Sequence, residues 1–166
     1  MSESANNGIA NNGAYLAPHL VVANGEKAIE FYTQVLGAKL IGKQTAPNSP
    51  KIMHAALEIY GSTFFLCDDF PEYSNGRGRT PHDLNGSPVT LHIQSSEADA
   101  IFERATKGGA VATFPIQDMF WGDRYGKFVD PFGHEWSVGQ KIKQLTDKEI
   151  EAGAKEAFSK AGKGCD

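Results

Sequence analysis

Residues 118–136 read DMFWGDRYGKFVDPFGHEW. Within this segment, Asp130-Pro131-Phe132-Gly133 has the residue types of a tight turn, because proline fixes φ and glycine accepts a left-handed backbone. Short strand-like runs lie on both sides of the turn, at residues 127–129 and 135–138. The segment therefore predicts a β-hairpin near the end of the chain.

Upstream of this hairpin, strand and helix patterns alternate. Ala98, Ile101, Phe102 and Ala105 recur at helical spacing. Ser96 is the expected N-cap of this helix, and Gly108-Gly109 its end. Strand-like runs flank the helix at residues 88–94 and 110–114.

The first half of the chain has the same order of elements. A strand at residues 15–22 precedes a helix at residues 26–36, for which Asn24 is the expected N-cap and Gly37 the end. Three more strands are predicted, at residues 38–44, 52–59 and 62–67.

The two halves correspond residue by residue at a few positions. Gly37-Ala38 matches Gly109-Ala110, and His19 matches His92. A repeat of this kind indicates a duplicated structural unit. The predicted organisation is a domain over residues 14–145, with repeats at about 15–68 and 87–140 joined by a polar loop.

Both ends of the chain differ from this domain. Residues 1–13 are small, polar and rich in Gly and Asn, which predicts a disordered tail. Residues 146–161 predict an appended C-terminal helix, because Thr146 and Glu149 form a capping box ahead of an apolar stripe. We expect this helix to pack on the domain or on a second subunit.

Composition excludes several classes of protein. With 166 residues, 40% of them hydrophobic, the chain has the makeup of one globular domain or two small ones. A net charge of −4 without a basic cluster argues against nucleic acid and anionic membranes as partners. No apolar run reaches the ~20 residues of a membrane span, and no signal peptide is seen. Two cysteines, Cys67 and Cys165, cannot build a disulfide framework, so a cytoplasmic location is expected.

The segments at residues 118–126 and 130–136, together with the helix at 26–37, resemble PhnB-like proteins. These are a branch of the vicinal oxygen chelate superfamily, which includes glyoxalase I, ring-cleaving dioxygenases and bleomycin-resistance proteins. The resemblance implies an α+β fold in which two βαβββ modules form a curved mixed sheet around a cavity, here with an extra C-terminal helix. It also implies a homodimer, because many members are dimers.

Metal-dependent members of that superfamily hold a divalent ion with His, Gln or Glu at four strand positions. The resemblance places those positions at Ala17, Phe65, Thr90 and Ser137. Ala and Phe cannot bind a metal, and neutral hydroxyls are weak ligands. We therefore expect no metal and no cofactor. A displaced site built on His54 and Glu58 is the alternative, although a surface pair explains these two residues as well.

Three polar residues are candidates for catalysis. His19 and His92 are expected to share the faces of the metal positions, because residues two apart in a strand share a face. Either can act as a general base or hold an anionic or carbonyl ligand, or both can be hydrogen-bonded core histidines. Glu135 can be a base or the partner of a cationic ligand, or a solvated charge at a strand edge.

The candidates for ligand binding are Trp121, Arg124, Thr90 and Ser137. Arg124 can hold a carboxylate or phosphate while Trp121 covers the ligand, both from a loop. Alternatively, Asp123 and Arg124 form a structural ion pair that holds the loop in place.

The sequence thus predicts a glyoxalase-like protein with a small-molecule cavity and an unassigned substrate. An enzyme of this kind uses His19, His92 or Glu135 near a polarised carbonyl or epoxide. A non-catalytic binding protein of the bleomycin-resistance type, a scaffold with an occluded cavity, and a metal-dependent lyase with a rewired site are the alternatives. Nucleotide-binding and hydrolase motifs such as GxGxxG and GxSxG are absent from the sequence.

Overall fold

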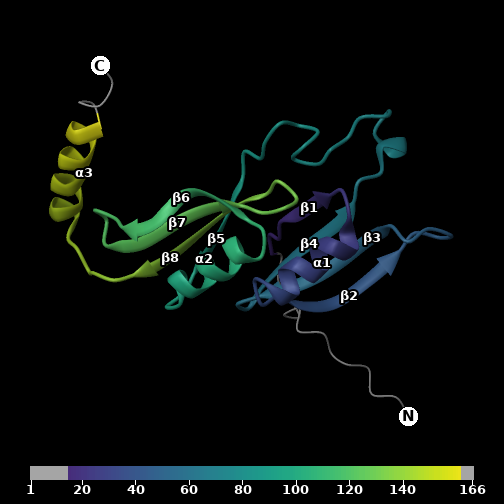
Figure 1. Ribbon diagram of the computed structural model, residues 1–166, viewed down its shortest axis with the longest axis horizontal. Helices are drawn as coiled ribbons and strands as arrows, with labels where there is room; N and C mark the ends of the chain where they lie inside the picture. The colour runs from purple at the N-terminus through teal and green to yellow at the C-terminus, as the bar shows by residue number, and fades with distance from the viewer. Residues whose placement is uncertain (1–14, 162–166) are drawn as a thin grey trace, which may run out of the picture. The chain divides into compact units, whose positions relative to one another are not determined.

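The computed structural model describes residues 15–161. The predicted tail, residues 1–13, lies outside this range. The chain divides into two compact units, one ending at Leu84 and one beginning at Asn85. Each unit contains one four-stranded sheet and is described separately (Figure 1).

The first unit follows the predicted order of elements. These are β1 (His19–Val22), α1 (Gly25–Gln34), β2 (Lys39–Thr45), β3 (Ile52–Ile59), β4 (Ser62–Asp68) and the short 3₁₀ helix η1 (Pro71–Tyr73). The strand order is β1-β4-β3-β2, with β1 parallel to β4 and the other pairs antiparallel. Asn24 caps α1 as predicted, since its side chain accepts the backbone N–H of Lys27.

The second unit repeats this plan and adds a helix. Its elements are β5 (Thr90–Gln94), α2 (Ala98–Lys107), β6 (Val111–Asp118), β7 (Asp123–Val129), β8 (Glu135–Lys141) and α3 (Asp147–Ala161). The strand order β5-β8-β7-β6 is that of the first unit, again with the first strand parallel to the last. The predicted α+β fold of two βαβββ modules with a C-terminal helix is confirmed.

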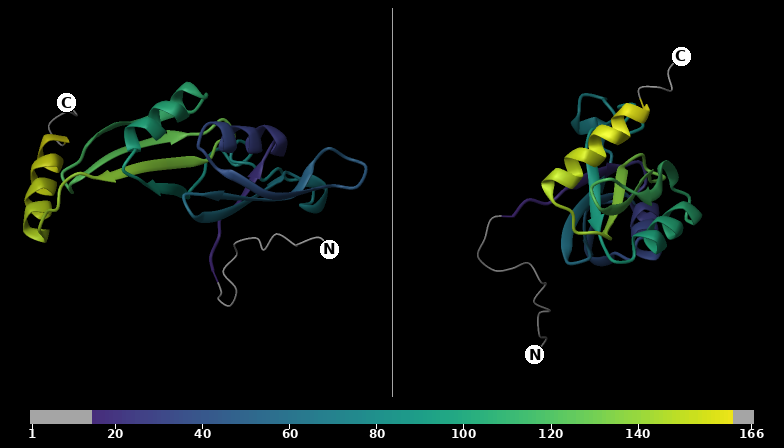
Figure 2. Two further views of the ribbon diagram at one scale, coloured as in Figure 1. Left: turned by 90° about the horizontal axis from the view of Figure 1, so that it is seen from below. Right: turned by 90° about the vertical axis from the view of Figure 1, so that its left-hand side faces the viewer.

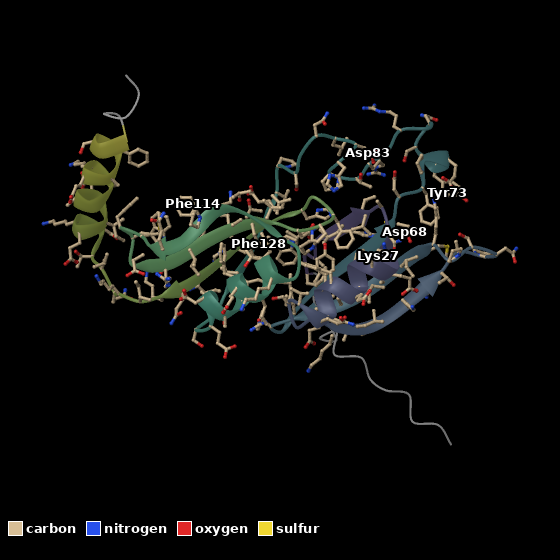
Figure 3. The ribbon with its side chains drawn as sticks, viewed as in Figure 1. Lys27, Asp68, Tyr73, Asp83, Phe114 and Phe128 are labelled. Atoms are coloured by element: carbon tan, nitrogen blue, oxygen red, sulfur yellow. The ribbon has the colours of Figure 1, made fainter. Side chains whose placement is uncertain are left out.

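Each sheet buries the face that its own helix covers (Figure 2). In the first unit, Tyr32 of α1 lies against Phe64 of β4, with ring centroids 5.4 Å apart. In the second unit, Phe128, labelled in Figure 3, is fully buried and packs edge-to-face on Phe102 of α2. Burial of these apolar side chains is the main stabilising contribution to each unit.

A buried carboxylate organises each unit. Asp68 accepts the backbone N–H of Gly25 at 2.8 Å and that of Ile52 at 2.6 Å, which joins α1 to β3. Asp130 accepts the backbone N–H groups of the turn that follows it and the indole N–H of Trp136. The predicted turn at Asp130–Gly133 is therefore held by its own first residue.

The predicted start of α2 is wrong by one residue. The helix begins at Ala98 after Glu97, which makes no side-chain capping bond. The Ser95 hydroxyl accepts the Glu97 N–H instead, so the serine pair forms a local turn before the helix. Short hydroxyl side chains often bond to nearby backbone in this way, in competition with a helix cap.

The strands β6 and β7 are both longer than the runs predicted at residues 110–114 and 127–129. β6 continues to Asp118 and β7 starts at Asp123, so Arg124 lies in a strand and not in a loop. Two register shifts in β6 interrupt the alternation of inward and outward side chains by which a strand is recognised in a sequence. β6 also contains Pro115. An edge strand tolerates such a proline, because its outer N–H groups have no partner strand.

Within the range that the structure describes, no helix has the length and apolar character needed to cross a membrane.

Candidate functional site

The second sheet carries polar and aromatic side chains on the face opposite α2. Alternation along β5 directs Ile93 into the core and His92 to the opposite face. His92 lies beside Ser137 of β8, and Ser137 lies beside Lys127 of β7. We call this set of residues the polar face: Thr90, His92 and Gln94 of β5, Tyr125 and Lys127 of β7, and Glu135 and Ser137 of β8.

His92 is held through both ring nitrogens. Its Nδ1 lies 2.8 Å from Ser137 Oγ, and its Nε2 lies 3.0 Å from Gln94 Oε1. Because the Gln94 carbonyl oxygen can only accept, Nε2 donates this bond. Gly139 makes room for this arrangement, since a Cβ there would lie 3.0 Å from His92 Cε1. Partners on both ring nitrogens thus fix the orientation of the ring.

Glu135 is paired within the polar face. Its carboxylate accepts Lys127 Nζ at 2.5 Å and the hydroxyl of Thr90. The bond to Lys127, followed by that to Thr90, holds the pKa of Glu135 below its usual value. The hydrogen bond to Glu135 in turn raises the pKa of Lys127. Glu135 is therefore a charged, oriented carboxylate and a weaker base than a free one.

Aromatic rings border these polar groups. Tyr125 stacks against His92, with ring centroids 6.1 Å apart and an interplanar angle of 21°. Trp121, in the turn between β6 and β7, meets Tyr125 edge-on at 5.7 Å. Phe114 of β6, labelled in Figure 3, lies 6.1 Å from Tyr125. Trp121 is half-buried, so part of its ring faces solvent within the described chain.

Arg124 points away from this face. Its guanidinium donates two hydrogen bonds to Asp99 of α2, at 2.6 and 2.7 Å, and one to Asp118 at 3.0 Å. Asp123 pairs instead with Lys141, at 3.2 Å. The alternative of an Asp123–Arg124 ion pair is therefore wrong, because adjacent strand residues project to opposite faces. The guanidinium lies on the helix side of the sheet, apart from Trp121.

His19 occupies the matching position in the first unit but has different neighbours. Phe65 stands opposite His19, where Ser137 stands opposite His92. The His19 ring lies 5.9 Å from that of His54 and 6.0 Å from that of Phe65. Burial, and then the charge of His54, lower the pKa of His19. The two histidines thus occupy equivalent positions in the repeat. Of the two, His92 is the one that lies opposite a hydroxyl group, that of Ser137.

A family model supports the resemblance noted from the sequence. The Glyoxalase/Bleomycin resistance protein/Dioxygenase superfamily matches residues 14–138. The chain belongs to this superfamily. An uncharacterised protein of Mycobacterium bovis, Mb0911c, is 43% identical over 149 residues, which cover 90% of this chain and 95% of the relative. The YjdN protein of Escherichia coli is 28% identical and is covered over 98% of its length.

Solved structures of this superfamily's fold are similar to the chain. Protein PA1353 from Pseudomonas aeruginosa matches with a TM-score of 0.65 and 24% identity, over 79% of this chain and 100% of that one. A PhnB protein from Bacillus cereus, described as a putative 3-demethylubiquinone-9 3-methyltransferase, matches with a TM-score of 0.59 and 18% identity, over 76% and 99%. At such identities these likenesses show the fold alone.

The side chains at the four positions that the resemblance assigns to the metal do not have the chemistry of divalent-ion ligands. Ala17 precedes β1, and Phe65 offers a carbon ring. The hydroxyls of Thr90 and Ser137 are engaged by Glu135 and His92. Among residues 15–161, no group of three or more His, Cys, Asp or Glu side chains is placed to hold a metal.

Three members of the polar face were not among the predicted site residues: Gln94, Tyr125 and Lys127. Gln94 follows His92 by two residues, so strand alternation alone places it on the same face. Tyr125 and Lys127 required the register between β7 and β8. That register depends on where the turn between the two strands ends. The turn predicted at residues 130–133 was the feature of the sequence from which the register could have been derived.

Proposed function

We propose that this protein is a PhnB-like member of the superfamily that binds a small molecule on the polar face without a divalent metal. The supporting observation is the oriented His92, held by Ser137 and Gln94 beside the ring of Tyr125, which in turn contacts the ring of Trp121. Fixed polar groups next to aromatic walls are typical of small-molecule sites. The motif at residues 118–136 supports the PhnB-like assignment.

The neighbouring groups favour a planar aromatic or conjugated ligand that carries a carbonyl or carboxylate. Trp121 and Tyr125 provide ring surfaces for stacking, which an extended π-system matches. Lys127 has three donor protons, and the pairing with Glu135 uses one of them. The ammonium can therefore donate to a ligand oxygen while Glu135 keeps it in place.

Binding without catalysis is the function that this geometry supports best. Both ring nitrogens of His92 are already hydrogen-bonded, to Ser137 and Gln94, and the bond from Lys127 lowers the basicity of Glu135. An enzyme that uses a histidine base is the second candidate, supported by the lowered pKa of His19, which keeps that imidazole neutral and able to accept a proton. We propose a homodimer and a cytoplasmic location on the basis of the superfamily resemblance.

A thermal-shift screen of small metabolites tests the binding function. We expect planar carbonyl or carboxylate compounds to raise the Tm of the wild-type protein and to lose most of this effect in Trp121→Ala and His92→Ala. Equal stabilisation of the wild type and both variants would place the ligand elsewhere. Any turnover of such a compound that disappears in His19→Gln but persists in His92→Ala would favour the enzyme.

Metal analysis of protein purified without chelators tests the second part of the proposal. We expect less than one tightly held transition metal ion per chain, because the four family positions lack ligands. One equivalent of Zn, Ni, Mn or Fe that is lost in Glu135→Gln or His92→Ala would show a rewired metal site.

A further inference from the structure

The segment that follows β8 is attached to the turn carrying Trp121. The backbone N–H groups of Ile142 and Lys143 both donate to the carbonyl oxygen of Gly122, at 3.0 and 2.9 Å. Gly122 has a φ of +90°, and a Cβ there would lie 2.5 Å from the Lys143 carbonyl oxygen. Only glycine permits this close approach, so the turn and the segment form one structural piece.

α3 then contacts the same turn through a glycine. A Cβ at Gly153 would lie 3.0 Å from Phe120 Cβ and 3.4 Å from the Phe120 carbonyl oxygen. Along α3, the half-buried positions are Ile150, Gly153 and Ala154, which form one face at helical spacing. Glycine is unfavourable inside a helix, but at this point of contact its lack of a side chain allows α3 to pack closely on Phe120.

Phe120 connects this contact to the polar face. Its ring meets that of Trp121 at 4.9 Å, nearly perpendicular. Trp121 meets Tyr125, and Tyr125 stacks on His92. Phe120 and Trp121 are half-buried, and their rings are in direct contact, so a displacement of one ring acts on the other through that contact. A shift of Phe120 therefore moves Trp121, which is one wall of the proposed site.

We propose that residues 142–153 are part of the ligand site of this protein: they set the position of Trp121, and Gly153 is the positioning residue. The proposal rests on the proposed function of the polar face. It assigns the appended helix a role in affinity, although α3 contributes no side chain to the polar face itself.

Substitution of Gly153 by leucine tests the positioning step without any ligand. The protein is labelled with 5-fluorotryptophan, and the ¹⁹F signal of Trp121 is assigned with Trp121→Phe. We expect Gly153→Leu to shift the Trp121 signal and to leave that of the buried Trp136 unchanged. Ala152→Leu, on an exposed position of the same helix, is the control and should shift neither. An unshifted Trp121 signal in Gly153→Leu would overturn the inference.

Binding of 2-naphthoate, a planar aromatic carboxylate, tests the consequence for affinity. We expect Trp121→Ala and Gly153→Leu to weaken its binding roughly three- to tenfold, the range of one lost stacking contact, and Ala152→Leu to have no effect. Weaker binding in Trp121→Ala with unchanged binding in Gly153→Leu would refute the role of α3 alone. No saturable binding to the wild type would refute the proposed function, while the ¹⁹F shift would still decide the positioning step.

Gly153→Ala provides a second test if leucine prevents folding, as judged by circular dichroism. Its Cβ is tighter than an ordinary contact but needs a shift of only a few tenths of an ångström, and alanine favours the helix. We expect a smaller displacement of the Trp121 signal in the same direction. A signal identical to that of the wild type would contradict the inference.

Discussion

Gly139 has no side chain, and this leaves space for the His92 ring and its hydrogen bond to Gln94. A Cβ at this position would lie 2.9 Å from Gln94 Oε1 and 3.0 Å from His92 Cε1. The backbone of β8 therefore passes directly beneath the histidine. A side chain here would displace the ring or break its bond to Gln94.

We predict that Gly139→Ala disturbs the position of His92 but costs less than about 1 kcal/mol of unfolding free energy, because the new Cβ meets the ends of the exposed side chains of Gln94 and His92, which can move. Urea denaturation measures the stability, and ¹⁵N spectra of the imidazole report the tautomer. Gly42→Ala is the control, because a Cβ there has nothing within 4 Å. Similar behaviour of the two variants would show that the space around His92 is not limiting.

His19 makes the stability of the first unit depend on pH. Its pKa in the folded state is lowered, first by burial and then by the charge of His54. The unfolded chain thus binds more protons in the interval below the ordinary value of ~6.5, so acidification through that interval destabilises the fold.

The predicted result is a free energy of unfolding that falls from pH 7.5 to pH 5.5 more steeply in the wild type than in His19→Gln. Urea titrations at several pH values provide the comparison. Parallel curves for the two proteins would show that the protonation of His19 does not contribute.

At the scale of elements, Asp68 determines how α1 is attached to its sheet. Both carboxylate oxygens accept buried backbone N–H groups, one from the start of α1 and one from β3. A Cβ at Gly25 would lie 2.7–2.9 Å from Ile52 and Asp68, so helix and sheet meet without a gap. The first backbone N–H groups of a helix have no acceptor within the helix, and the carboxylate of Asp68 provides one for Gly25.

We expect Asp68→Ala to destabilise the protein by roughly 2–4 kcal/mol, because it leaves two buried donors unsatisfied. Chemical denaturation with Glu30→Ala, which removes an exposed carboxylate of α1, gives the comparison. Equal losses in the two variants would mean that solvent or another group replaces the Asp68 bonds.

The elements themselves were largely predictable from local sequence. Asn24 caps α1, Gly37 has the left-handed φ of 78° that follows a helix, and β3 has the predicted bounds. The errors occurred where local signals compete. Ser95 takes the capping bond expected near Ser96, and the bulges of β6 interrupt the period of two that identifies a strand.

At the scale of the whole molecule, the two units share one strand order but differ in what they place on the free face of the sheet. The first unit has Phe65 opposite a histidine, and the second has Ser137. Duplication thus preserved the architecture while the side chains diverged. This difference is why the proposed site belongs to the second unit.

The proposed homodimer predicts a solution mass of twice 17.9 kDa. Light scattering coupled to size exclusion at micromolar concentration measures it. A mass of one chain would show that this member departs from the common state of its superfamily.

Sequence alone was enough to predict the paired modules and their helices, while the lack of a metal at the family positions stays a prediction. These features depend on residue type and on contacts between residues close in sequence. Such contacts can be predicted from the periodicity of apolar residues and from the residue types of turns. The partners of His92 and Arg124 came only from the tertiary structure. His92 and Ser137 are 45 residues apart, and Arg124 and Asp99 are 25 apart. Such pairs depend on strand order and register, which are set by packing of the complete sheet against its helix and leave no local pattern in the chain.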